Sequence, residues 1–109
     1  MDTSIPRVRG LNLSPQQVEA LRPFAHYIWW KDVDQTMQRP DLLIGQVMNI
    51  GHYDDVCRLL DLVGTKVLLY VLQTADPGQF SLPSWTYWHY RLTDIAPGQV
   101  PPLPKRRFA

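Results

Sequence analysis

The chain has 109 residues, a formal net charge of +1 and one cysteine, which suits a single compact domain that buries roughly 65% of its unfolded surface without a disulfide or metal. The near-neutral charge gives no overall field that favours nucleic acid or an anionic membrane, and Cys57 alone cannot form an internal bridge. Because no apolar run approaches the roughly 20 residues that span a bilayer and the first residues lack an apolar signal-peptide core, we expect a cytoplasmic protein without a membrane segment.

The first predicted helix starts after Ser14. Residues 1–12 are polar and mixed, so we expect a flexible N-terminal arm. Ser14 is a suitable N-cap, Pro15 occupies the first helical position, and Gln17 follows three residues after the cap, which is the pattern of a capping box. Pro23 disfavours helical backbone at the residue before it, so this helix should end or kink there.

Residues 24–34, with the sequence FAHYIWWKDVD, are ambiguous. The segment is aromatic and β-branched enough for a strand, but the chain offers no partner strand. A short helix or an extended packing segment is therefore favoured. Trp29 and Trp30 cannot share one face in either conformation, so one of them should lie near the surface.

Three helices are predicted in the middle of the chain. Pro40 and Asp41 open the first, which carries an apolar stripe and stops at Gly51. The second covers residues 53–63 and ends at Gly64, and Thr65 then caps a very apolar helix over 66–73 that should be central. The apolar stripes contain Leu43, Val47 and Ile50 in the first helix and Val56, Leu59, Leu60 and Val63 in the second.

An aromatic helix is predicted after Ser81, which can act as its N-cap, with Pro83 in the first turn. One face is expected to join the core, and the other carries residue types that dominate interface hot spots. This second face is therefore either ordinary surface or a partner-binding surface. The inner face holds Trp85, Trp88, His89 and Leu92, and the outer face holds Tyr87, Tyr90 and Arg91.

The fold predicted from these patterns is all-α. Four to six short helices form one domain over residues 13–95, and a proline-rich basic tail covers 96–109. The patterns show no internal repeat, and we expect no second domain within these 109 residues.

The tail combines a stiff rod with positive charge. Proline this dense favours polyproline II, which orders at low entropic cost on binding. Such a peptide suits docking into an acidic groove or along a phosphate backbone, and the alternative is a C-terminus that packs partly back on its own domain. The rod comprises Pro101, Pro102, Leu103 and Pro104, the cationic cluster is Lys105, Arg106 and Arg107, and Phe108 is an apolar anchor.

No pattern of catalytic or metal-binding residues is present in the sequence. His26, His52 and His89 lie at spacings that match no standard zinc pattern. Asp54 and Asp55 are adjacent on a predicted helix and so point in different directions, which favours solvated charges at a helix start. We therefore predict no catalytic residue, no metal and no cofactor, and a protein that is not an enzyme.

From Phe24 to Phe108 the chain resembles small bacterial proteins that are usually encoded beside AbiEii-type nucleotidyltransferase toxins. The resemblance covers most of the chain beyond the first predicted helix. It rests on Trp29-Trp30-Lys31-Asp32, Leu43-Ile44-x-x-Val47-Met48-x-x-Gly51, Asp54-x-x-x-x-Leu59-Leu60-x-x-x-Gly64, Phe80-Ser81-x-x-Ser84-Trp85-x-x-Trp88-His89-Tyr90-Arg91-Leu92 and the ending Pro102-x-Pro104-x-Arg106-Arg107-Phe108.

The resemblance implies an antitoxin-like protein that binds and restrains a nucleotidyltransferase, and it transfers no catalytic residue. A different hypothesis is a small nucleic-acid-binding regulator, in which aromatic residues beside arginine stack on bases and the tail contacts phosphates. Self-association through apolar patches also stays open. For partner binding, we predict Tyr87, Tyr90, Arg91, Lys105, Arg106, Arg107 and Phe108.

Overall fold

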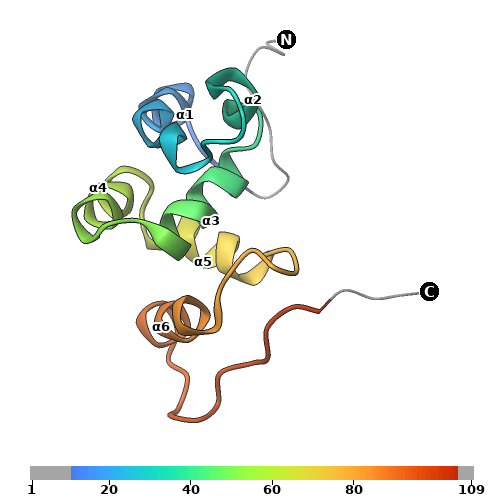
Figure 1. The fold of residues 1–109 in the computed structure, drawn as a ribbon. Coiled ribbons are helices and arrows are strands. Elements are labelled where there is room, and N and C mark those ends of the chain that lie inside the picture. The colour runs from blue at the N-terminus through green and yellow to red at the C-terminus, as the bar shows by residue number, and fades with distance from the viewer. Residues whose placement is uncertain (1–10, 106–109) are drawn as a thin grey trace.

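The computed structural model describes residues 11–105, and this part of the chain is helical with no strand (Figure 1). The predicted all-α class is therefore confirmed. None of the helices within these residues is long and apolar enough to cross a bilayer. The elements in chain order are α1 (Pro15–Ala20), the 3₁₀ helix η1 (Arg22–Tyr27), α2 (Val33–Met37), α3 (Pro40–Ile50), α4 (Tyr53–Val63), α5 (Thr65–Gln73) and α6 (Leu82–Leu92).

Helix α3 lies at the centre of the fold. It contacts η1 and α2 on one side and α4, α5 and α6 on the others, as the arrangement around it in Figure 1 shows. Leu43, Ile44 and Val47 of α3 are fully buried. The apolar helix that we expected to be central, α5, packs directly against α3 and buries Leu68 and Leu72. One continuous core therefore connects α1 with α6.

The capping signals in the sequence act as predicted. The Ser14 side chain accepts a hydrogen bond from the Gln17 amide at 3.1 Å, and the Gln17 side chain accepts one from the Ser14 amide at 2.8 Å. The Ser81 side chain likewise accepts from the amide of Ser84. These contacts satisfy backbone N–H groups that have no partner inside their helices.

The segment after α1 differs in detail from the prediction. Helix α1 ends at Ala20, as expected from Pro23, and residues 22–27 form a 3₁₀ helix, which agrees with the short helix favoured for part of residues 24–34. Helix α2 follows as a separate short helix that was not predicted. Asp32 caps α2 by accepting a hydrogen bond from the Gln35 amide at 2.9 Å. The 3₁₀ form tolerates Pro23 because the proline falls in the first turn of η1, where no helical N–H is needed.

Two other local predictions were wrong. Thr65 is the first helical residue of α5 and not its cap, because Gly64 takes the cap position with a φ of 84° that reverses the chain. Ile50 does not complete the buried stripe of α3 but is 47% exposed, because it is the last helical residue before the chain turns away at Gly51.

Tyr27 joins η1 to the start of α4. Its hydroxyl donates to Asp55 Oδ2 at 2.5 Å and accepts from the His52 amide at 3.0 Å. Asp55, expected to be a solvated charge, is therefore a half-buried hydrogen-bond acceptor. Burial, followed by the bond to Asp55, raises the pKa of Tyr27 above its ordinary value of 10.0.

We expect Tyr27→Phe to lower the free energy of unfolding by about 1–3 kcal/mol, because it removes both hydrogen bonds and leaves the His52 amide unpaired. The raised pKa means that this contribution is complete below about pH 10 and declines as the pH rises further. Urea unfolding at pH 7 and above pH 10 measures both effects. Tyr53→Phe, which alters an exposed side chain, is the control at pH 7, and an unchanged midpoint for Tyr27→Phe at pH 7 would contradict the prediction.

Candidate functional site

Helix α6 is fixed to the end of α3 through its inner face. The indole N–H of Trp88 donates to the Met48 carbonyl at 2.8 Å, and the Ser84 hydroxyl donates to the Asn49 carbonyl at 2.8 Å. Trp85, Trp88 and His89 are buried and Leu92 is half-buried, which confirms the predicted inner face. The outer face of α6 is consequently held in a defined orientation.

Tyr87 and Arg91 come together on this outer face. One guanidinium N–H of Arg91 donates to the Tyr87 hydroxyl at 3.0 Å, and the guanidinium carbon lies 5.9 Å from the centre of the Trp88 ring. The rings of Tyr87 and Trp88 are nearly perpendicular, with centroids 5.1 Å apart. Because one turn of helix separates Tyr87 from Arg91, the helix itself sets this geometry.

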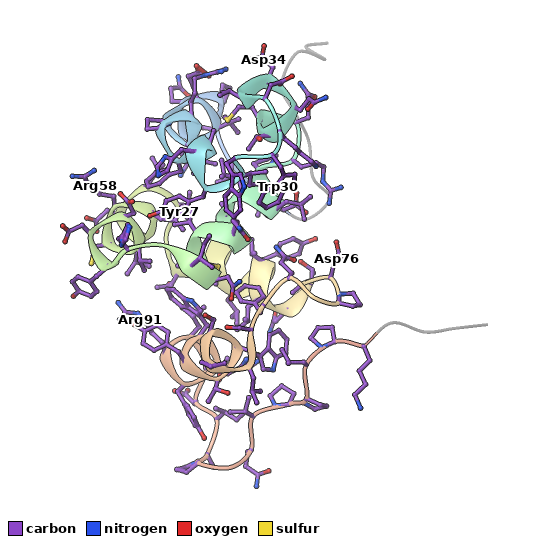
Figure 2. All side chains as sticks on the ribbon, viewed as in Figure 1. Tyr27, Trp30, Asp34, Arg58, Asp76 and Arg91 are labelled. Atoms are coloured by element: carbon purple, nitrogen blue, oxygen red, sulfur yellow. The ribbon has the colours of Figure 1, made fainter. Side chains whose placement is uncertain are left out.

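Tyr53, the first residue of α4, lies near enough to Arg91 for the charge of the guanidinium to act on its phenol, which no pattern in the sequence predicts. Its hydrogen bond with Cys57 is the main cause that raises the pKa of Tyr53, while the positive charge of Arg91 opposes the increase. Figure 2 shows Arg91 on the side of α6 nearest α4. Tyr53 is 75% exposed and Tyr87 is 48% exposed. We call Tyr53, Tyr87 and Arg91 the tyrosine–arginine face.

Tyr90, although predicted with Tyr87 and Arg91, contacts the tail. Its hydroxyl accepts a hydrogen bond from the Gly98 amide at 3.0 Å, and Trp85 Nε1 donates to the Pro101 carbonyl at 2.7 Å. The tail thus packs back on its own domain, which was the alternative expectation, and Lys105 is exposed beyond the packed part. The predicted site residues Arg106, Arg107 and Phe108 lie outside the described residues.

Trp29 and Trp30 form a second exposed aromatic surface, the tryptophan pair. They are 72% and 58% exposed, and their rings meet edge to face with centroids 4.8 Å apart. The expectation was that one of them would be near the surface, but both are. The reason is that Tyr27 and Ile28 take the buried positions at the end of η1, so the following turn carries both tryptophans outward.

A hollow of about 400 Å³ lies between η1 and α4. Asp55 and Arg58 contribute an ion pair to it, with 3.7 Å between Asp55 Oδ1 and Arg58 Nη1. Its apolar side chains suit a hydrophobic group, and its ion pair is exposed enough for water to weaken it. The lining residues are Ala20, Pro23, Phe24, His26, Asp55, Arg58 and Leu62.

The histidines are spread over separate parts of the fold. His26 Nδ1 lies 2.9 Å from the Pro23 carbonyl, His52 is exposed at the start of α4, and the buried His89 has Nδ1 at 2.8 Å from the Trp85 carbonyl. Within residues 11–105, no three His, Cys, Asp or Glu side chains gather in a way that could hold a metal ion. The backbone contacts of His26 and His89 give these rings structural roles.

Comparisons with protein-family models, curated proteins and solved structures found no match. The resemblance to the antitoxin-like family therefore stays a prediction. The remaining indication of function is the chemistry of the exposed surface. That surface offers a positioned guanidinium beside two exposed phenol rings, an arrangement suited to binding carboxylates and aromatic or apolar side chains of another protein.

Proposed function

We propose that this protein is a non-enzymatic binding module that docks on a nucleotidyltransferase and restrains it, as an antitoxin does. The observation that supports this most strongly is the positioned guanidinium of Arg91 on the tyrosine–arginine face. Tyr87 holds it by a hydrogen bond and Trp88 by its ring, and the face stays exposed.

A positioned arginine favours binding for two reasons. Its planar guanidinium can donate two parallel hydrogen bonds to a carboxylate. Holding the side chain before the complex forms also reduces the ordering cost, which is about 0.5–1.5 kcal/mol for a flexible side chain. Tyr53 and Tyr87 supply apolar area around the charge at low entropic cost, as tyrosines at interfaces commonly do.

An acidic cleft is the partner surface that complements these groups. Nucleotidyltransferase sites hold acidic metal-binding residues and bind triphosphates, so a cationic surface placed across the cleft would both bind it and block it. Lys105 adds a further exposed cation, and Arg106 and Arg107 continue the charge in the sequence beyond the described residues. The proposal is that restraint occurs by occlusion and requires no chemistry from this chain.

Co-purification tests the proposal. The tagged protein is expressed with the product of the adjacent gene, and we expect a nucleotidyltransferase to co-purify at a fixed stoichiometry and to lose activity in the complex. The variant Arg58→Ala, which alters an exposed arginine on the opposite side of α4 from Arg91, should retain the complex. Isolation of a monomer with no protein partner would overturn the proposal.

A nucleic-acid-binding regulator is the second candidate, and the tryptophan pair favours it. Exposed aromatic rings followed by Lys31 are suited to stacking on single-stranded bases beside a phosphate contact. The purified protein is also tested for binding to a single-stranded oligonucleotide. An affinity that falls steeply as the salt concentration rises would support this candidate. Absence of binding at low salt would eliminate it.

A further inference from the structure

The C-terminal residues 96–104, which we call the strap, run back along α6. Figure 1 shows the chain leaving α6, reversing and passing the helix again as an extended segment. The reversal is a turn in which the Gln99 amide donates to the Ala96 carbonyl at 3.0 Å. Pro97 and Gly98 occupy its central positions, and the φ of 81° at Gly98 is what a type II turn requires.

Two hydrogen bonds attach the strap backbone to side chains of α6. The Tyr90 hydroxyl accepts a hydrogen bond from the Gly98 amide at 3.0 Å, and the indole N–H of Trp85 donates one to the Pro101 carbonyl at 2.7 Å. Trp85 and Tyr90 are about 7.5 Å apart along the helix axis at the rise of an α-helix. Gly98 belongs to the turn, and the three residues of chain from it to Pro101 can span at most about 10 Å. This reach covers the spacing on the helix, so both bonds can form together.

The apolar contacts of the strap follow the polyproline II repeat. Val100 and Leu103 are half-buried against the core, whereas Pro101 and Pro102 between them are exposed. A polyproline II strand turns once every three residues, so Val100 and Leu103 lie on one side of it. The prolines fix their own φ and restrict the residues before them to extended backbone, so the strap's own sequence preforms this shape.

We propose that the surface of α6 between Trp85 and Tyr90 is a recognition groove for an extended strand of the pattern apolar–Pro–Pro–apolar. The strap is its resident occupant, and the strap of a second copy of the chain binds in its place when the resident strap is detached. This inference does not rest on the nucleotidyltransferase proposal, because it uses only contacts inside the chain.

The groove recognises backbone hydrogen-bonding groups and two apolar side chains, which a strap from another copy of the chain also supplies. Both hydrogen bonds use side chains on the groove and backbone groups on the strand. The only further requirements are two apolar side chains one polyproline turn apart. Because the resident strap is tethered close by, its effective concentration is on the order of millimolar, and it excludes a competing strand at ordinary protein concentrations.

The test uses the full chain with Val100→Asp and Leu103→Asp, which places carboxylates at the half-buried positions and detaches the strap. A fluorescent peptide with the sequence of residues 96–105 is the probe, and fluorescence anisotropy measures its binding. We expect the peptide to bind this double variant at least about tenfold more tightly than it binds the wild-type protein, whose groove is filled. A peptide carrying the same two aspartates is the control and should not bind.

Adding Trp85→Phe to the double variant tests the hydrogen bond itself, because the aromatic ring stays and the N–H is lost. Peptide affinity should fall roughly five- to tenfold. If the double variant does not unfold cooperatively, the single variant Val100→Ser replaces it. Equal binding of the probe to wild type and variant, equal binding of both peptides, or no binding to any folded variant would overturn the proposal.

Discussion

The Trp88→Ala variant is expected to lose a large share of the stability of the domain. Trp88 is 1% exposed, joins α6 to the core and donates its indole N–H to Met48. Truncating a buried tryptophan costs about 3–5 kcal/mol through lost burial and the cavity that remains. The Met48 carbonyl also loses its indole partner. Since domains of this kind are stable by about 5–15 kcal/mol, the loss is a large share of the total.

Urea unfolding followed by circular dichroism measures this change. Trp88→Phe separates the two contributions, because it keeps most of the ring and removes only the hydrogen bond and part of the volume. Trp30→Ala is the matched control: the side chain is also a tryptophan but is 58% exposed, so its removal should change the free energy of unfolding by no more than about 0.5 kcal/mol. Similar losses for Trp88→Ala and Trp30→Ala would show that α6 is not held through Trp88.

The Arg91→Ala variant is expected to weaken the proposed complex with a nucleotidyltransferase by about 2–4 kcal/mol, or roughly 30- to 1,000-fold in Kd. Arg91 is the charged centre of the tyrosine–arginine face, and its removal leaves a partner carboxylate without its bidentate cation. Because the side chain is exposed, the free protein should remain as stable as wild type.

Titration calorimetry on the isolated components measures the affinity. Tyr87→Phe should have a smaller effect, about 1 kcal/mol, since it removes the hydroxyl that accepts the Arg91 hydrogen bond and keeps the ring. Arg91→Lys should not restore full affinity, because an ammonium lacks the planar fork. Arg58→Ala is the charge-matched control. If Arg91→Ala binds with the wild-type Kd, the tyrosine–arginine face is not the interface.

Part of the candidate site followed directly from the sequence. Tyr87 and Arg91 are one helical turn apart, so a helix over this segment necessarily brings them together. Tyr90 was predicted on the same outer face, but its hydroxyl contacts the tail, because the turn at residues 96–99 brings the Gly98 amide to it. Helical periodicity predicts the direction in which a side chain such as Tyr90 points. It does not predict which residues from elsewhere in the chain will contact that side chain.

Other parts of the site required the tertiary structure. Tyr53 lies on a different helix from Arg91, and only the packing of α3, α4 and α6 places the two near each other. The exposure of both tryptophans of the pair follows from how Tyr27 and Ile28 fill the core. The strap contacts depend on a chain reversal after α6, and neither hydrogen bond between strap and helix has a signature in the sequence of either segment alone.

The sequence by itself determined the helical class, most helix boundaries and the inner face of α6. Those features depend on neighbours within about one turn of helix: caps such as Ser14 and Ser81, prolines at helix starts, glycine at Gly64 and the spacing of apolar residues. The tertiary structure alone decided that Tyr53 lies within reach of the charge of Arg91 and that Trp85 binds the strap. These pairings join segments far apart in the chain, and their geometry is fixed only when the whole core packs as a unit.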